Sequence, residues 1–241
     1  MGRASTSTGR VVLVTGEGDL AAAVVGNLAA RGAHVVLAGP EAEDARGAMP
    51  PGAPTLTLPC APGDPAALGR AVDTVVDRLG RIDHLVNLVA ARPRPGPLME
   101  MDPLALRDIL HSAFVTSLAC VQRAYWRWMA AHGGSVVNVV AAGARGGPQD
   151  AALAGLTELT EWLAAELAPR VDVHALVPGP SLNYTAAYQA GAAEAVCALL
   201  TRRTDSTHGP VLVLTEDPVC PSRAWSARRT RAQATTGRAP T

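Results

Sequence analysis

The amino-acid sequence predicts an α/β protein with a Rossmann-like doubly wound parallel sheet of seven strands and helices on both faces. Three observations support this prediction. Short apolar runs alternate with helix-like segments along most of the chain, as in parallel sheets with right-handed crossovers. The strand-like runs are continuously apolar, which is typical of strands covered on both faces. Hydrophobic residues make up 48% of the chain and aromatic residues only 3%, a composition suited to closely packed layers.

The first half of the chain is predicted to form four strands and two helices. The strands are expected in the apolar runs at residues 10–15, 33–39, 54–60 and 82–90. A helix over residues 20–32 is expected to end at Gly32, because glycine readily adopts the left-handed conformation that terminates helices. A second helix is expected over residues 64–80, with Pro65 in its first turn, where a missing amide costs nothing.

The second half of the chain is predicted to continue the alternation and then to end in a tail. Helices are expected over residues 103–129, 150–168 and 187–203, and strands over 134–141, 171–179 and 210–215. Residues 1–217 therefore form the Rossmann-like domain. Residues 218–241 are rich in Arg, Thr, Ala and Pro without periodicity, which predicts a flexible C-terminal tail.

The composition excludes several classes of function. All 21 residues counted as Lys or Arg are arginine, so Schiff-base and P-loop chemistry are excluded. The 21 acidic residues balance them, and we expect neither a nucleic-acid nor a membrane partner. We also expect no apolar run of the ~20 residues that a membrane span needs. Four widely separated cysteines predict a reduced, cytoplasmic protein without a metal site, and they are Cys60, Cys120, Cys197 and Cys220.

The turn after the first predicted strand lies where a doubly wound sheet would bind a pyrophosphate. It reads TGEGDLAAA and resembles the turn of the short-chain dehydrogenase/reductase family, T-G-x-x-x-G-x-G. Thr15 and Gly16 match, whereas Leu20 and Ala22 replace the second and third glycines. We expect the Leu20 side chain to project into the space of the phosphates. Two carboxylates in this turn, including Glu17, are expected to repel an anion.

The resemblance implies that further cofactor positions have changed. Pro40 stands where NADP-dependent members commonly carry an arginine, and Cys60 stands where an aspartate usually meets the adenine. Asn87 is retained from the family's N-N-A-G segment, and Gly179 is retained from its P-G segment. The resemblance therefore implies a vestigial site consisting of Gly16, Asn87 and Gly179, and we expect no cofactor to be bound by this chain.

The family's four catalytic positions can be placed in the same way. The serine position falls on Ala141, or on Val140 if the alignment shifts by one residue. The tyrosine and lysine positions fall on Leu153 and Thr157, and the asparagine position falls on Ser112. Family catalysis combines hydride transfer from the cofactor with acid–base chemistry by the tyrosine and lysine. The chain is therefore predicted to have no family-type catalytic residue.

Another chemistry remains conceivable from the residues alone. Asp108 and His111 lie three residues apart on a predicted helix, close to Ser112, and Asn138 ends a predicted strand. A His–Asp pair can act as an acid and a base, which would suit a cofactor-independent dehydratase, isomerase or cyclase. A solvent-exposed pair on the helix surface is the simpler interpretation. A regulatory protein that senses a small molecule is a further alternative.

The two helices that the family uses for dimerisation are rich in aromatic residues. Segments 103–129 and 150–168 contain five of the eight aromatic residues, namely Phe114, Tyr125, Trp126, Trp128 and Trp162. Aromatic residues are enriched at protein–protein interfaces, although the same side chains could also cover the sheet. The leucines at 156, 159, 163 and 167 are well explained by packing on the sheet. We predict a hetero-oligomer through these helices with a homologous catalytic subunit.

The combination of a retained fold and lost catalytic residues also resembles one particular group within the family. It is similar to the non-catalytic subunit of the heterotetrameric ketoreductases in aminocoumarin antibiotic biosynthesis. This resemblance implies a pseudoenzyme whose catalytic partner binds NADP(H). The reaction implied for the assembly is oxidation of a carrier-protein-bound β-hydroxytyrosine to its β-keto form.

Overall fold

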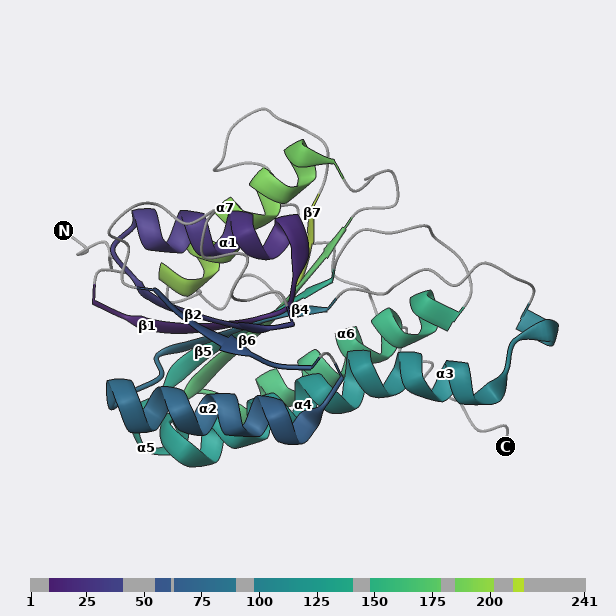
Figure 1. Cartoon of the computed structure of the whole chain (residues 1–241), viewed down its shortest axis with the longest axis horizontal. Coiled ribbons are helices and arrows are strands. Elements are labelled where there is room, and N and C mark those ends of the chain that lie inside the picture. The colour runs from purple at the N-terminus through teal and green to yellow at the C-terminus, as the bar shows by residue number, and fades with distance from the viewer. Residues whose placement is uncertain are drawn as a thin grey trace, which may run out of the picture.

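The computed structural model describes residues 9–40, 55–61, 63–89, 98–140, 148–178, 185–201 and 210–214. It confirms the predicted sheet, in which seven parallel strands lie in the order β3-β2-β1-β4-β5-β6-β7 (Figure 1). The predicted tail, 218–241, lies outside the described residues. The strands are β1 (Val11–Thr15), β2 (His34–Gly39), β3 (Thr55–Pro59), β4 (His84–Val89), β5 (Gly134–Val140), β6 (Val171–Pro178) and β7 (Val211–Leu214).

Helices cover both faces of the sheet (Figure 1). On one face lie α1 (Gly18–Ala30) and α7 (Ala186–Thr201), which pack against each other. On the other face lie α2 (Pro65–Leu79), α6 (Pro148–Leu167) and a long helical run. The run consists of α3 (Pro103–Leu110), the π turn η3 (His111–Val115), α4 (Thr116–Ala124), the π turn η4 (Tyr125–Met129) and α5 (Ala130–His132), and the short 3₁₀ turn η2 (Leu98–Glu100) precedes it.

Alternate side chains of each strand enter two separate cores. Leu13 and Leu85 pack on the face covered by α2, α4 and α6, whereas Val12 and Val86 pack on the face covered by α1 and α7. All four are 0% exposed. Because both faces of a strand are buried, the strand must be apolar at every position, and this explains the continuous runs in the sequence.

Helix termini carry the signals that the sequence indicates. The carboxylate of Asp64 accepts hydrogen bonds from the amides of Ala66 and Ala67, and Pro65 follows it at the first position of α2. The same helix ends at Gly80, whose φ of 71° is left-handed. These features are the N-cap and C-cap that favour a helix boundary at each end.

The long helix differs from its prediction in one respect. The sequence predicts one regular helix over 103–129, but the helical run extends to His132 and contains two π turns. In η3 the hydroxyl of Thr116 donates to the carbonyl of His111, five residues earlier, at 3.0 Å. The backbone amide of Thr116 donates to the same carbonyl, which is the hydrogen bond of a π turn, so the hydroxyl adds a second donor to it.

The long helix is also more apolar than the sequence prediction allowed. The run Pro103–His132 is long and apolar enough by length and composition to cross a membrane, and an 18-residue window has a mean hydropathy of 1.4. The expectation that no apolar run approaches this length was therefore wrong. Only 28% of that window is buried, although Ala113, Cys120 and Val121 contribute to the core. Much of the apolar surface of this helix is not covered by the described part of the chain.

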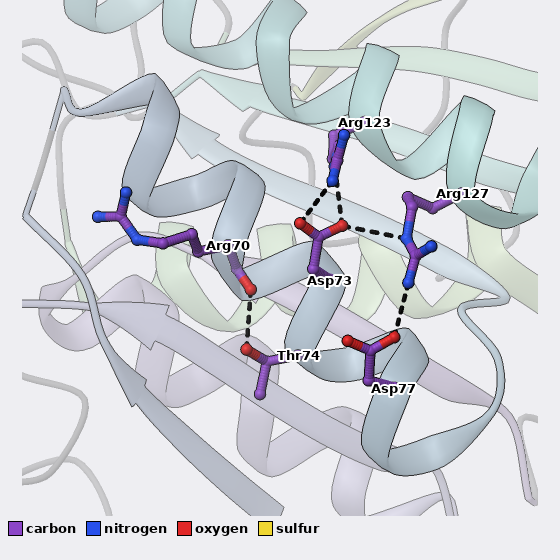
Figure 2. Close-up of polar contacts among 6 residues, drawn as sticks. All are labelled: Arg70, Asp73, Thr74, Asp77, Arg123 and Arg127. Carbon is purple, nitrogen blue, oxygen red and sulfur yellow. Dashed lines mark hydrogen bonds and ion pairs between the residues drawn. The ribbon is translucent and has the colours of Figure 1, made fainter.

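Ion pairs join the long helix to α2 along one side (Figure 2). Arg123 binds both carboxylate oxygens of Asp73 at 2.8 and 2.6 Å. Arg127 contacts Asp73 at 3.1 Å and Asp77 at 2.6 Å. The hydrogen bond from Arg123 lowers the pKa of Asp73, and its effect outweighs that of partial burial.

We expect Asp73→Asn to destabilise the fold by about 1 kcal/mol, since the carboxylate is partly exposed and exposed ion pairs contribute little. The measurement is urea unfolding of the variant beside Glu166→Gln, which removes an exposed carboxylate from α6. A double-mutant cycle with Arg123→Gln isolates the pair. Additive single effects would show that the Asp73–Arg123 contact contributes no coupling energy.

Candidate functional site

A cavity of about 520 Å³ opens at the carboxyl ends of β1, β2, β3 and β4. This is the edge at which open α/β sheets bind their ligands, near the point where the strand order reverses between β1 and β4. The size falls within the range of small-molecule sites. Its described wall consists of Thr15, Gly16, Glu17, Ala38, Gly39, Pro40, Cys60, Ala61, Gly63, Leu68, Asn87, Leu88, Val89, Asp108, Ile109, His111, Ser112, Thr116 and Ser117.

Two glycines shape the turn between β1 and α1. Gly16 has φ +139°, and a Cβ on it would lie 2.7 Å from the Cβ of Leu88. A Cβ on Gly39 would lie 2.1 Å from the carbonyl oxygen of Gly16. The amide of Gly16 also donates to the carbonyl of Ala38 at 3.0 Å. Only glycine fits at these two positions. The absence of a side chain allows the end of β2 to lie directly against the turn after β1 at the edge of the cavity.

The predicted cofactor positions surround this cavity. Gly16, Pro40, Cys60 and Asn87 all lie in its wall, so the structure brings these four positions together. Gly179 lies outside the described residues. Burial raises the pKa of the Cys60 thiol, and the carboxylate of Asp64 raises it further. Cys60 is therefore a neutral thiol in a partly apolar wall.

The expectation for Leu20 was wrong. Its side chain is only 2% exposed and packs in the core between the sheet and α1, together with Val24 and Leu28. It does not enter the cavity wall. Because α1 begins at Gly18, position 20 lies in the first helical turn and faces the sheet. Replacement of the second family glycine by leucine therefore leaves the space above the turn open.

The described wall of the cavity carries acidic side chains where a dinucleotide would place its phosphates. Among the described wall residues, the acidic side chains are Glu17 and Asp108, and no arginine is present. A phosphate-binding turn attracts an anion with backbone amides at the positive end of a helix. Here Glu17 occupies the N-cap position of α1, at the positive end of the helix. The glycine turn retains its shape, but the chemistry of these side chains opposes a phosphate-bearing cofactor.

The family's catalytic positions lie apart in the described part of the chain, and only one of them lines the cavity. Ser112 lies in the cavity wall, and its hydroxyl donates to the carbonyl of Ile109 at 3.1 Å. Leu153 packs against the core, and the hydroxyl of Thr157 donates to the Leu153 carbonyl at 2.9 Å. Neither Leu153 nor Thr157 lines the cavity. Ala141 lies outside the described residues, so the serine position is not placed.

The alternative acid–base residues do meet at the cavity. Asp108, His111 and Ser112 all belong to its wall. Asp108 accepts hydrogen bonds from its neighbour Arg107 at 3.2 and 3.0 Å, and both side chains are well exposed. Asp108 thus has a partner other than His111, which supports the interpretation of a surface carboxylate. Asn138 is not part of the wall.

A buried polar chain crosses the sheet beside the cavity. The hydroxyl of Thr15 donates to Asn87 at 3.1 Å, Asn87 donates to Asn138 at 3.0 Å, and Asn138 donates to Thr160 of α6 at 2.9 Å. Thr160 in turn donates to the Leu156 carbonyl at 2.8 Å. Thr15, Asn87, Asn138 and Thr160 are at most 7% exposed. Each amide therefore has a partner inside the core, as buried polar groups require.

Sequence reasoning noticed Asn87 and Asn138 separately but did not connect them. The connection follows from strand register, because Thr15 pairs with Asn87 and Asn87 pairs with Asn138 across neighbouring parallel strands. Each polar residue lies near the end of an apolar run, and this shared position was the available signal. No comparable signal identified Thr160, because its contact depends on how α6 docks onto β5.

The helices on the face with α2 leave a second candidate surface, which we call the aromatic helix face. It consists of Leu104, Leu110, Val115 and Trp126 on the long helix and Trp162 on α6. Trp126 is 76% exposed and Trp162 is 65% exposed. By contrast, Leu156, Leu159, Leu163 and Leu167 are all buried, so the leucine stripe covers the sheet as expected. Trp126 and Trp162 are large enough to anchor an interaction surface on this side of the molecule.

The segment Tyr125–Met129 divides its side chains between core and surface. Tyr125 and Trp128 pack against the core, and Trp128 also stacks on His132 with ring centres 3.6 Å apart. Trp126 points outward and meets Tyr125 edge to face. The ion pairs of Arg127 with α2 fix the side of the helix that faces inward (Figure 2).

Comparison with known proteins agrees with this architecture. Residues 15–207 match the family described as Enoyl-(Acyl carrier protein) reductase. A citronellol catabolism dehydrogenase from Pseudomonas aeruginosa PAO1 is 27% identical, with a TM-score of 0.71 over 83% of this chain and 91% of that chain. A short-chain dehydrogenase/reductase from Serratia marcescens BCRC 10948 is 24% identical, with a TM-score of 0.75 over 87% and 97%.

A short-chain type dehydrogenase/reductase from Mycobacterium ulcerans shares the fold at 20% identity, with a TM-score of 0.72 over 86% of this chain and 88% of that chain. The matching family segment spans most of the sequence, and it includes the glycine turn, the cavity and both helix layers. These findings agree with the resemblance detected in the turn that begins at Thr15. The chain belongs to the short-chain dehydrogenase/reductase family.

Proposed function

We propose that this chain is a non-catalytic subunit that assembles with a homologous, catalytically complete short-chain reductase. The observation that carries the proposal is the set of residues at the family's catalytic positions. Leu153 and Thr157 contain no group that can protonate a carbonyl or lower a phenol pKa, and Ser112 bonds to its own helix. Without these groups, the chain lacks the acid–base machinery for hydride transfer.

The aromatic helix face supports the assembly part of the proposal. Trp126 and Trp162 expose large apolar surfaces to solvent in the isolated chain. Aromatic anchors of this kind contribute much of the binding energy in protein–protein interfaces. We propose a homologous subunit as the occupant, because its own long helix and α6 equivalent would present a matching helix pair.

The finer role follows the resemblance stated from the sequence. We propose that NADP(H) is bound by the catalytic partner and that this chain binds none, in accordance with the acidic cavity wall. The proposed setting is a cytoplasmic heterotetramer in antibiotic biosynthesis. The proposed reaction of the assembly is oxidation of a carrier-protein-bound β-hydroxytyrosine to the β-keto form.

Co-expression of the tagged chain with the homologous reductase encoded nearest to its gene tests this proposal. We expect a stable hetero-oligomer by size-exclusion chromatography with light scattering. We expect Trp126→Glu to weaken the complex by at least about tenfold in Kd, because burial of an added charge opposes association. Trp162→Glu should act in the same direction.

The matched control is Ala30→Glu, which adds the same charge on α1 in the opposite helix layer (Figure 1). It should leave the complex unchanged, and circular dichroism should show that every variant is folded. A homo-oligomer that ignores the reductase and turns over a substrate by itself would contradict the proposal.

The second candidate function is a stand-alone, cofactor-independent dehydratase, isomerase or cyclase. The observation in its favour is that Asp108 and His111 both lie in the wall of the cavity. Loss of turnover in His111→Ala, with unchanged folding, would establish this function in place of the subunit role.

A further inference from the structure

The hydroxyl groups of the cavity wall are oriented as hydrogen-bond acceptors. Ser112, Thr116 and Ser117 donate to the carbonyls of Ile109, His111 and Ala113, at 3.1, 3.0 and 2.8 Å. Thr15 donates to the side chain of Asn87 at 3.1 Å. A hydroxyl has one hydrogen and two lone pairs, so each of these groups offers a ligand only lone pairs. Thr116 and Ser117 are each 5% exposed, and their positions are fixed by the π-turned helix.

The acidic groups of the described wall also favour a ligand that donates hydrogen bonds. Glu17 and Asp108 are acceptors when ionised, and His111 is the one basic side chain in that part of the wall. Arg107 binds one oxygen of Asp108 from outside the cavity, because Arg107 itself is not part of the wall. A ligand that brings N–H donors and positive charge would therefore meet suitable partners.

The remaining wall is apolar. Pro40, Leu68, Leu88, Val89 and Ile109 surround the polar positions, and Leu68 and Ile109 also belong to the core. A cavity of about 520 Å³ with apolar walls and a few oriented polar groups is the usual construction of a small-molecule site. The apolar part suits an uncharged carbon body, and the acceptors suit a donor attached to it.

We infer that the cavity binds a small cationic ligand, a protonated amine on an apolar body, in place of the phosphate-bearing dinucleotide that this edge of the sheet would otherwise hold. The amine nitrogen donates to the carboxylate and hydroxyl oxygens, and the apolar body contacts the aliphatic wall. This inference concerns the cavity alone and is independent of the subunit role, which depends on the aromatic helix face.

Three probes with the same ring and different charge test the inference on the full chain. They are benzylamine, which is cationic near neutral pH, benzyl alcohol, which is neutral, and benzoate, which is anionic. NADP⁺ is the fourth probe. We expect fragment affinities on the order of millimolar from ligand-observed NMR titration. Benzylamine should bind about tenfold more tightly than benzyl alcohol, as one ion pair near the surface allows, and benzoate should bind most weakly.

Variants of the wall carboxylates test whether they cause the preference for benzylamine over benzyl alcohol. In the Glu17→Gln, Asp108→Asn double variant, the advantage of benzylamine over benzyl alcohol should fall to about twofold or less. Glu158→Gln on α6 removes an exposed carboxylate that is not in the wall, and it should keep the full preference. An unchanged preference in the double variant, or its loss in Glu158→Gln, would overturn the inference. So would tighter binding of benzoate or NADP⁺ than of benzylamine.

The thiol of Cys60 provides a second readout that needs no change in the wall. Cys60 is 6% exposed and lies in the wall, whereas Cys120 and Cys197 are buried outside it. In a Cys220→Ser background, benzylamine should slow the reaction of Cys60 with a maleimide about twofold at its Kd and at least about threefold at twice its Kd and above. No protection of Cys60 by saturating benzylamine would place the bound amine elsewhere and would overturn the inference. Probe affinity and Cys60 protection are both measured on the isolated chain. They therefore test the inference even if the chain does not assemble with a reductase.

Discussion

Gly39→Ala is expected to destabilise the protein by about 3 kcal/mol, because a methyl group at this position meets backbone that cannot move aside. The added Cβ would lie 2.1 Å from the carbonyl oxygen of Gly16, far inside van der Waals contact. Relief requires β2 to separate from the turn after β1, where the amide of Gly16 donates to Ala38. The measurement is the urea midpoint and slope of the variant, followed by fluorescence or circular dichroism.

The control for this substitution is Gly26→Ala in α1. A Cβ at Gly26 has nothing within 4 Å, so the change adds only helix propensity and should stabilise the protein by about 0.5–1 kcal/mol. The two substitutions are chemically identical and are expected to have opposite signs. A small effect of Gly39→Ala would show that the turn relaxes easily and that the close approach of the two strands is not required.

The second large effect is a loss of stability on acidification, caused by His84. Its ring is 8% exposed at the start of β4, and its Nδ1 atom has no hydrogen-bond partner among the described residues. The pKa of His84 is lowered from 6.5 to about 4: burial contributes most, Asp83 opposes it, and Arg10 and Arg81 add to it. The folded protein therefore keeps this ring neutral over a range in which the unfolded chain protonates it.

The sign of the effect follows from proton binding. Between pH 6.5 and about 4 the unfolded state binds a proton at this position and the folded state does not, so stability falls as the pH falls. Each pKa unit is worth about 1.4 kcal/mol, and the complete contribution is about 3 kcal/mol. Above pH 6.5 this histidine is neutral in both states and contributes no pH dependence.

Urea unfolding at both ends of this pH range measures the contribution of His84. His84→Gln should lose most of the corresponding slope, so that the variant gains stability relative to the wild type as the medium becomes acidic. Val86→Ala, two positions further along the same strand, should destabilise equally at both pH values. An unchanged slope in His84→Gln would show that another group controls acid unfolding.

The sheet was predictable because its physics is local. Each strand is a short apolar run between polar or glycine-containing segments, and burial on both faces leaves few alternatives for such runs. The cavity wall was partly predictable for the same reason. Pro40, Cys60 and Asn87 follow or end successive strands, and the carboxyl ends of parallel strands meet at one edge.

Features that depend on docking between elements were not predictable. The expectation for Leu20 failed because it considered a single position in a turn and not the stripe Leu20, Val24 and Leu28, which identifies the buried side of α1. Thr160 was missed because no rule of spacing in α6 connects it to Asn138. The π turns leave no recognisable pattern, because their residues are ordinary helix formers and the extra residue is accommodated by tertiary contacts.

These π turns determine where the long helix can lose a residue without reorienting its side chains. A π turn contains one residue more than the α-helical turn it replaces, and each residue rotates an α-helix by about 100°. Deleting one residue within His111–Val115 and restoring a regular helix there would therefore leave the following residues at nearly the same rotation, whereas a deletion at the start of α4 would rotate everything that follows by that angle. After such a deletion in α4, Arg123 and Arg127 would leave Asp73, but after a deletion in the π turn both ion pairs could be kept. The π turn is thus the position at which this helix tolerates the loss of one residue, and an alignment that places a gap there keeps the same side chains facing a neighbour.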